Sequence, residues 1–370
     1  MKLGILTSSR ADYGIYLPLL QKIKNDSFFE LELIAFGTHM SRSHGYTLSD
    51  IEKEGYNCIH KISSLISNDD EESISSSYGL TVLKFADFWS KNTYDLVFCL
   101  GDRYEMSAAV QAGIPFGVKF AHLHGGETTL GAIDNVYRHQ ITLASDLHFA
   151  STDFFKQRII EITGSSKNVF SIGSLSLNNI KSFVPVEKQI FFDTYTIPNE
   201  KFALVTFHPE TVSLNDNVHY AKIMKDSLEI ISEKMFVIIT MPNADTQGSI
   251  YREAIQNLKN EFPNRFLLIE NFGKNNYFSA MYYAEILIGN TSSGILEAAS
   301  FGKYVVNVGD RQKGRAQSAN VLNCDFDQPA IIAAVTEVFN KGSFEGENIY
   351  YKDGVSDSIV KIIKNTYESI

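Results

Sequence analysis

Short apolar runs alternate along the chain with longer segments in which apolar residues recur every three or four positions. The short runs have the length and the β-branched content of strands, and the longer segments have the period of amphipathic helices. Several runs are apolar at every position, as in a parallel sheet that is covered on both faces. In the first half of the chain, strands are predicted at 2–7, 31–36, 57–62, 95–100, 116–123, 147–150 and 169–173, and helices at 13–25, 72–91, 104–113, 133–144 and 152–163.

The second half repeats this rhythm. Strands are predicted at 202–207, 235–240, 265–270, 285–289 and 304–309, and helices at 217–233, 249–260, 276–284, 293–301, 328–340 and 355–368. Between the halves, residues 174–200 are of mixed character and hold two of the eight prolines, so a linker with one short helix is predicted there.

These elements predict an α/β fold of two doubly wound, Rossmann-like domains that face each other across a cleft. In such sheets ligands bind beyond the carboxyl ends of the strands, so functional residues are expected directly after the apolar runs. One acidic segment, NDDEESISSS at 68–77, is predicted to be a mobile loop that precedes a helix.

The composition limits the kinds of partner. A net charge of −10 argues against binding to nucleic acid or to an anionic membrane, since both need basic patches. No stretch approaches the roughly 20 apolar residues of a membrane-spanning helix, and the apolar run at 2–7 is too short for a signal peptide. Cys58, Cys99 and Cys324 lack a metal-binding spacing, so free thiols and a cytoplasmic protein are expected.

Polar residues follow nearly every predicted strand. Because parallel strands end at the same edge of a sheet, we expect these residues to gather at the ligand-binding edge. The segments are 7–14, 101–105, 124–127, 208–211, 243–245, 289–294 and 309–315.

The segment GNTSSG at 289–294 has the composition of a phosphate-binding helix start. The first turn of a helix leaves backbone N–H groups unsatisfied, and Ser292 and Ser293 add hydroxyl donors. Glu297, one turn further, suits the two hydroxyls of a ribose, so the segment predicts nucleotide binding. An ordinary helix N-cap is the alternative, because serine and threonine are favoured there as well. The chain lacks GxxxxGK[ST], and its first strand lacks GxGxxG, which argues against a P-loop ATPase and a dehydrogenase.

Two arginines are candidates for binding a diphosphate through charge-assisted hydrogen bonds. Arg10 follows the first strand and Arg311 follows the strand predicted at 304–309. A solvated surface position is the alternative for a single loop arginine.

Three carboxylates, Asp102, Glu127 and Asp134, stand at two adjacent strand ends of the first half. Carboxylates that lie close together in a cleft shift one another's pKa values and can provide both a proton acceptor and a proton donor. Asp102 and Asp134 also precede helical segments, so a role as helix N-cap is the alternative for both. Arg138 lies one turn after Asp134 and is expected to support this group from the same helix face.

The histidines do not indicate a metal. His122, His124 and His139 match no common zinc spacing, so no metal is expected. His208 follows a strand and is a candidate for contacting phosphate or transferring a proton. His60 and His219 are expected at structural or surface positions.

Seven motifs occur in the order SSRADYG, LGDRYE, HLHGGETTLGAIDNVYRH, FHPET, NADT, GNTSSG and GDRQKGR. They resemble the hydrolysing UDP-N-acetylglucosamine 2-epimerases of sialic-acid and related nonulosonic-acid biosynthesis, and the likeness covers almost the whole chain. The resemblance implies the fold of the B-type glycosyltransferases. It implies an N-terminal domain at 1–174 with the acid/base cluster, a UDP-binding domain at 175–352, and a C-terminal helix at 353–370 that packs back on the first domain.

The resemblance also implies a reaction. UDP leaves C1 of the sugar while the C2 proton is removed, and water then adds to the 2-acetamidoglucal to give N-acetylmannosamine. It implies no cofactor and no metal, and a homodimer or homotetramer. The residues matched by motif are Asp102, Glu127 and Asp134 as acid/base groups, His208 near the diphosphate, Asn243 as a supporting residue, and Arg10, Ser292, Ser293, Glu297 and Arg311 as UDP ligands.

One departure concerns the third motif. Some family members have EGGE where this chain has HGGE, and this chain carries one extra residue before the Asp134 motif. The bacterial sialic-acid branch resembles this chain in both respects. Either Glu127 or His124 can therefore occupy the central acid/base position.

Four other functions remain open at this point. A non-hydrolysing epimerase would release an intact UDP-sugar, and a hydrolysing enzyme of legionaminic-acid synthesis would use UDP-N,N′-diacetylbacillosamine. A glycosyltransferase of the same fold would need an acceptor site. A nucleotide-sugar sensor would bind without turnover and would not need three carboxylates.

Overall fold

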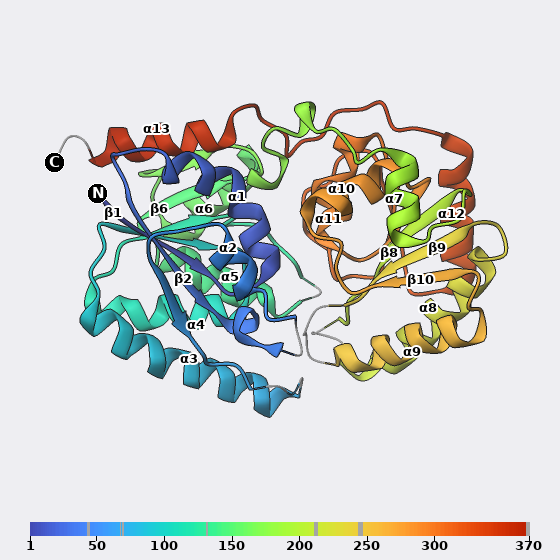
Figure 1. The fold of residues 1–370 in the computed structure, drawn as a ribbon, viewed down its shortest axis with the longest axis horizontal. Coiled ribbons are helices and arrows are strands. Elements are labelled where there is room, and N and C mark those ends of the chain that lie inside the picture. The colour runs from blue at the N-terminus through green and yellow to red at the C-terminus, as the bar shows by residue number, and fades with distance from the viewer. Residues whose placement is uncertain are drawn as a thin grey trace. The chain divides into compact units, whose positions relative to one another are not determined.

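The computed structural model of the chain describes residues 1–42, 45–66, 68, 70–130, 132–210, 214–242 and 247–367. The chain divides into two compact units (Figure 1). Unit one consists of Met1–Glu127, Asp134–Asn179 and Tyr350–Ile370, and unit two consists of Thr128–Ile133 and Ile180–Ile349. Each unit is therefore built from separate stretches of sequence.

Unit one is a parallel sheet with the strand order β3-β2-β1-β4-β5-β6-β7. Its strands are β1 (Lys2–Thr7), β2 (Glu30–Phe36), β3 (Ile59–Ile62), β4 (Leu96–Leu100), β5 (Phe120–Leu123), β6 (Leu147–Ala150) and β7 (Val169–Ser171). Its helices are α1 (Arg10–Lys24), α2 (Leu48–Lys53), α3 (Glu71–Lys91), α4 (Tyr104–Gly113), α5 (Asp134–Leu143), α6 (Asp153–Thr163) and α13 (Val355–Tyr367).

Both faces of this sheet are covered, as its continuous apolar strands predict. Successive side chains of a strand point to opposite faces. Ile5 belongs to the core that α1 and α13 cover, whereas Leu6 belongs to the core under α3 and α4, with Phe85 and Met106. The inner strands β4, β5 and β6 are fully buried for this reason, whereas the edge strand β3 is mostly half-buried.

Unit two repeats this plan with the strand order β10-β9-β8-β11-β12-β13. Its strands are β8 (Phe202–Thr206), β9 (Phe236–Thr240), β10 (Phe266–Ile269), β11 (Ile286–Gly289), β12 (Val305–Val308) and β13 (Val321–Cys324). Its helices are α7 (Lys188–Tyr195), α8 (Asn217–Ile231), α9 (Gly248–Glu261), α10 (Lys274–Tyr283), α11 (Ser292–Leu296) and α12 (Gln328–Lys341). The helices α8, α9 and α12 cover one face, and α7 and α10 cover the other.

The last helix, α13, completes the core of unit one. Val355, Ile359 and Ile363 are fully buried in the same cluster as the apolar side of α1. The red α13 lies beside the blue α1 in Figure 1. Among the described residues, no helix has both the length and the hydropathy to cross a membrane.

The predicted α/β fold class of two doubly wound units is confirmed, and each strand predicted from the sequence is present. The sequence missed α2 and the edge strand β13, whose residues are mostly half-exposed. The mobile acidic loop predicted at 68–77 is wrong from Glu71 onward, because α3 begins there. Asp70 caps this helix by accepting a hydrogen bond of 2.7 Å from the Ser73 N–H.

The helix predicted at 293–301 is two pieces. Five residues form α11, and a 3₁₀ turn follows at Ala298–Phe301. The linker predicted at 174–200 holds the short helix α7, as predicted, preceded by 3₁₀ turns at Leu175–Leu177 and Ile180–Ser182.

Candidate active site

The carboxyl edge of the unit-one sheet brings together Asp102, His124, Glu127 and Arg138. Asp102 follows β4, His124 and Glu127 follow β5, and Arg138 lies on α5. The adjacent positions of β4 and β5 in the sheet explain why their end loops meet. The strand order therefore brings these four side chains to one edge of the sheet.

Asp102 forms an ion pair with Arg138, whose Nη2 donates a short hydrogen bond to Oδ2. The Asp102 side chain is 25% exposed, whereas that of Arg138 is 2% exposed. The N-cap of α4 is Arg103 and not Asp102, so the capping role considered for Asp102 is wrong. The Asp102 carboxylate is instead bound by the buried guanidinium of Arg138, and it remains accessible to solvent.

His124 and Glu127 form a second pair within this cluster. His124 Nδ1 lies 2.9 Å from Glu127 Oε1, and Ser151 Oγ donates to the same oxygen over 2.7 Å. The Glu127 side chain is only 1% exposed. The two candidates for the central acid/base position, His124 and Glu127, are therefore joined by a hydrogen bond.

Arg138 links the two pairs. Its Nη1 donates to the His124 carbonyl oxygen over 2.8 Å and lies 3.8 Å from Glu127 Oε2. A buried carboxylate is tolerated only when charge and hydrogen bonds compensate it, and Arg138 supplies this for Glu127. The predicted supporting role of Arg138 has a clear geometric basis, although its partners are Asp102 and Glu127 and not a group on its own helix.

Asp134 is the first residue of α5, one turn before Arg138, and is half-buried. It belongs to the same unit as Asp102 and Glu127. A carboxylate in the first turn is favourably placed relative to the helix dipole.

The other histidines of this region have structural positions. His122 is fully buried on β5, and its Nε2 donates to the Gly101 carbonyl oxygen over 2.9 Å. Burial lowers the pKa of His122 well below its usual value, so this ring is neutral. Burial and the charges of Arg138 and Arg158 lower the pKa of His139 as well.

The loop after β1 contains a network that the sequence analysis missed. Asp12 accepts hydrogen bonds from Thr7 Oγ1 at 2.7 Å and from the Ser8 N–H at 2.8 Å, and it forms a capping box with Ser9. Burial raises the pKa of Asp12, but hydrogen bonds and the charge of His39 outweigh this effect and lower it below its usual value. The network fixes the start of α1, where the half-buried Arg10 is the first residue.

In unit two, the loops after β8 and β11 are joined by Asn290. Its side-chain amide accepts from the His208 N–H at 2.7 Å and donates to the His208 carbonyl oxygen at 2.8 Å. Gln312 Nε2 donates to the Asn290 carbonyl oxygen at 2.8 Å, and Arg311 Nη1 donates to the Pro209 carbonyl oxygen at 3.3 Å. His208 and Arg311, both predicted site residues, therefore belong to one connected edge.

The helix start at α11 follows Gly289. This glycine has φ +139°, and a Cβ there would lie 1.9 Å from the Thr206 carbonyl oxygen, so only glycine fits. Thr291 is the N-cap but its side chain makes no capping hydrogen bond, and Ser292 and Ser293 are the first helical residues. An ordinary side-chain N-cap therefore does not explain the hydroxyl cluster. Burial raises the pKa of Tyr277 to about 12, and hydrogen bonds with Ser293 and Thr206 offset part of this effect.

Glu297 is 6% exposed at the end of α11, and its charge acts on Lys274. Burial lowers the pKa of Lys274 to about 8, and Glu297 offsets part of this effect. The sequence analysis missed Lys274. Because the helix was predicted from residue 276, nothing in the sequence indicated that Lys274 is the first residue of α10.

Glu210 is a second residue that was missed. It is 3% exposed, and its Oε1 accepts from the Asp310 N–H at 2.7 Å, which holds the loop that carries Arg311. Burial and the nearby charge of Asp310 raise the pKa of Glu210, although backbone hydrogen bonds oppose this. Gly309, at φ +77°, leaves space for this carboxylate, since a Cβ there would lie 2.5 Å from Oε1. The predicted residue Asn243 lies outside the described residues.

Each unit is thus a doubly wound α/β sheet with polar side chains at the carboxyl ends of its strands, which is the plan of nucleotide-binding α/β proteins. The family model for UDP-N-acetylglucosamine 2-epimerase matches residues 21–364, and the chain belongs to this family.

Relatives and solved structures agree with this assignment. The chain is 35% identical over 327 residues to GDP/UDP-N,N′-diacetylbacillosamine 2-epimerase (hydrolyzing) of Campylobacter jejuni, covering 88% of this chain and 85% of that protein. It is 32% identical over 375 residues to polysialic acid biosynthesis protein P7 of Escherichia coli, covering 100% and 95%. The UDP-GlcNAc 2-epimerase of Neisseria meningitidis bound to UDP-GlcNAc superposes with a TM-score of 0.80 at 18% identity, covering 99% and 100% of the two chains.

Proposed function

We propose that this protein is a hydrolysing 2-epimerase that converts UDP-N-acetylglucosamine to N-acetylmannosamine and UDP, without a cofactor or a metal. The observation that carries the proposal is the cluster of Asp102, His124, Glu127 and Arg138 at the carboxyl edge of unit one. Membership of the epimerase family supplies the substrate class. The Campylobacter jejuni relative, which is named as a hydrolysing enzyme, supports the hydrolytic outcome.

The reaction explains why carboxylates and anion-binding groups are both needed. The C2 proton is barely acidic, so its removal must accompany cleavage of the C1–O bond. The proton passes to a base, the electron pair of the C1–O bond leaves with UDP, and a C1–C2 double bond forms. Water then adds its hydroxyl to C1, and a proton returns to C2 from the opposite face, which inverts that carbon.

We assign the removal of the C2 proton to Asp102, acting as the general base. The Asp102 side chain is a quarter exposed, so a substrate can reach it. Its ion pair with Arg138 fixes the orientation of the carboxylate. Glu127 is enclosed and acts through His124, which it orients by the hydrogen bond to Nδ1. The His124–Glu127 pair, with Asp134, is assigned to the second proton transfer. A positioned general base contributes about 10²–10⁴-fold to the rate.

We assign UDP binding to unit two. Ser292 and Ser293 with the adjacent helix start bind phosphate, Glu297 binds the ribose hydroxyls, and Arg311 and His208 bind the diphosphate. Arg10 of unit one is assigned to the diphosphate and Asn243 to a supporting role. The proposal requires that both units act on the same substrate molecule. In it, residues 1–174 form the acid/base domain, residues 175–352 form the UDP-binding domain, and residues 353–370 form the helix that packs back on the first domain.

Incubation with UDP-N-acetylglucosamine in D2O, followed by proton and phosphorus NMR, tests the proposal. Free N-acetylmannosamine that carries deuterium at C2, together with UDP, is the expected result. An intact UDP-N-acetylmannosamine without free UDP would instead identify a non-hydrolysing epimerase. Binding without any product would identify a sensor and contradict the assignment of an enzyme.

UDP-N,N′-diacetylbacillosamine is the second candidate substrate, because the Campylobacter jejuni relative is named for it. Measurement of kcat/KM for both substrates decides between them. A ratio above one for UDP-N-acetylglucosamine is the expected result. Light scattering of the same sample is expected to give a dimer or a tetramer.

A further inference from the structure

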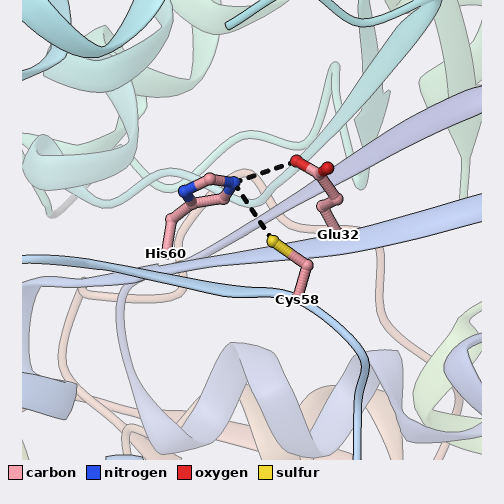
Figure 2. Close-up of side chains that lie close together, drawn as sticks. All are labelled: Glu32, Cys58 and His60. Carbon is pink, nitrogen blue, oxygen red and sulfur yellow. Dashed lines mark hydrogen bonds and ion pairs between the residues drawn. The ribbon is translucent and has the colours of Figure 1, made fainter.

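A second group of chemically reactive side chains lies in unit one, outside the proposed active site. Glu32 lies on β2, His60 lies on β3, and Cys58 comes two residues before His60 (Figure 2). Among the described residues, these three are the group whose His, Cys and carboxylate ligand atoms lie within 4.8 Å of one another. None of the three has a part in the proposed reaction.

The strand register explains why they converge. β2 and β3 are parallel neighbours, with Ile34 opposite His60. Glu32 precedes Ile34 by two residues, and Cys58 precedes His60 by two, so all three side chains project from the same face of the sheet. This is the face that α3 covers, where Phe88 makes an edge contact with the His60 ring.

The contacts exclude a thiol nucleophile of the kind that a histidine activates. His60 Nε2 lies 2.9 Å from Glu32 Oε2 and 3.4 Å from Cys58 Sγ, so both partners share one ring nitrogen. A catalytic histidine accepts from the nucleophile on one nitrogen and donates to the carboxylate from the other. Figure 2 shows the Glu32 oxygen and the Cys58 sulfur both directed toward the same ring nitrogen of His60.

We propose that Glu32, Cys58 and His60 form a binding site for a divalent transition-metal ion such as Zn²⁺. Bond lengths of about 2.0 Å to oxygen and nitrogen and about 2.3 Å to sulfur place tetrahedral ligand atoms roughly 3.3–3.6 Å apart. The Nε2–Sγ distance of 3.4 Å meets this value, and the Nε2–Oε2 distance of 2.9 Å needs only a small opening. A thiolate and an imidazole select Zn²⁺ over Mg²⁺ or Ca²⁺.

The surroundings orient the ligands. Lys2 Nζ lies 3.1 Å from Glu32 Oε1, and the Tyr94 hydroxyl donates to Oε2 at 2.6 Å, so the carboxylate orientation is fixed before a metal arrives. The His60 side chain is 26% exposed, which gives an ion access and leaves room for water as a fourth ligand. One thiolate and one carboxylate balance the two charges of the ion.

This site ties the edge strand β3 to β2, so it stabilises unit one and takes no part in turnover. The sequence analysis placed His60 at a structural position and Cys58 among the free thiols. A C-x-H spacing with a glutamate 26 positions away is not a recognised pattern, and only the strand register brings them together.

The test uses the full chain, without an affinity tag, after removal of metal by a chelator. Titration with Co²⁺ alone is expected to give the visible bands of a tetrahedral ion and a thiolate-to-metal charge-transfer band, and Zn²⁺ is expected to displace both. Cys58→Ser is expected to abolish the charge-transfer band, and His60→Ala to weaken Co²⁺ binding by at least about tenfold. The control Cys324→Ser, which removes the other half-buried thiol, is expected to leave both signals unchanged.

Absence of the charge-transfer band in the unsubstituted protein would overturn the proposal, as would a band that survives in Cys58→Ser. X-ray absorption of the Zn²⁺-loaded unsubstituted protein gives a second test that does not depend on any variant folding. One sulfur with nitrogen and oxygen ligands is expected, and a shell of oxygen and nitrogen alone would contradict the site. Turnover of the UDP-sugar is expected to be the same with and without Zn²⁺, which separates this site from the proposed function.

Discussion

The side-chain amide of Asn290 and the backbone of His208 form two reciprocal hydrogen bonds, of 2.7 and 2.8 Å. They join the loop that follows β8 to the loop that follows β11, across 82 positions of sequence. Both groups are buried, so the pair is not exchanged with water. The predicted phosphate-binding helix start and the predicted diphosphate histidine are therefore parts of one rigid edge.

Asn290→Asp removes one donor from this pair and places an oxygen against the His208 carbonyl oxygen. We expect a loss of about 1–3 kcal/mol in the free energy of unfolding, because a buried acceptor becomes unsatisfied. UDP affinity is expected to fall as well. Urea unfolding and calorimetry with UDP measure the two effects. The control Asn260→Asp makes the same chemical change at an exposed position and keeps the oxygen that accepts from Gln256.

Asp102→Asn and, separately, Glu127→Gln are expected to lower kcat by about 10²–10⁴-fold while UDP affinity is unchanged. Asp102→Asn keeps the shape of the carboxylate but cannot accept a proton, and Glu127→Gln removes the negative charge that supports a proton on His124. His124→Ala is expected to lose as much as Glu127→Gln, because the two are hydrogen-bonded. Asp146→Asn changes a surface carboxylate of the same unit and serves as the control. Retained turnover in both Asp102→Asn and Glu127→Gln would remove the acid/base assignment.

Ser293→Ala and Arg311→Ala are expected to weaken UDP binding, the arginine variant by about 10- to 100-fold because a hydrogen bond to a charged group is lost. Lys313→Ala is the matched control for loss of one positive charge, since Lys313 is 60% exposed and already paired with Asp310. Calorimetry with UDP measures all three. Equal affinities for the Arg311 and Lys313 variants would contradict the UDP site.

Lys274→Met tests the buried charge beside Glu297. The pKa of Lys274 falls from 10.5 to about 8 on folding. Between pH 8 and 10.5 the unfolded chain therefore binds more protons than the folded chain. In this range Lys274 makes the free energy of unfolding increase with pH. The contribution over that window is on the order of 3 kcal/mol. We expect the variant to lose this slope in urea unfolding at several pH values. Lys201→Met, at a side chain that is 64% exposed, is expected to keep it.

Gly289→Ala is expected to cost at least about 3 kcal/mol of stability or to prevent folding. The new methyl group would lie 1.9 Å from the Thr206 carbonyl oxygen, at a backbone angle that side chains rarely adopt. Gly79→Ala on the exposed side of α3 meets nothing within 4 Å and is expected to stabilise by about 0.5–1 kcal/mol. Thermal unfolding compares the pair. A neutral result at Gly289 would show that the helix start is not held against β8.

The sequence predicted the fold well because its strands are buried on both faces. The run FALV at 202–205, for example, contains only apolar residues and is fully buried. The edge strand β13 gives no such signal. Three of its four residues are half-buried and one is exposed, and a short segment of this kind is indistinguishable from a loop.

The candidate site was predicted in part for a similar reason. Asp102, Glu127 and His208 could be placed because strand ends of a parallel sheet share an edge. The partners of each side chain could not be placed, because they depend on distances across the fold. Lys274 and Glu210 were missed for this reason: each acquires its role from one loop in contact with another.

The path of the chain has a consequence for synthesis. Unit one begins at the first residue but receives Val355, Ile359 and Ile363 from α13. During synthesis its sheet is therefore complete long before its hydrophobic interior is closed, and Ile180–Ile349 of unit two is made in between. A nascent chain arrested after Ile349 would expose the apolar side of α1 that Val355, Ile359 and Ile363 otherwise cover.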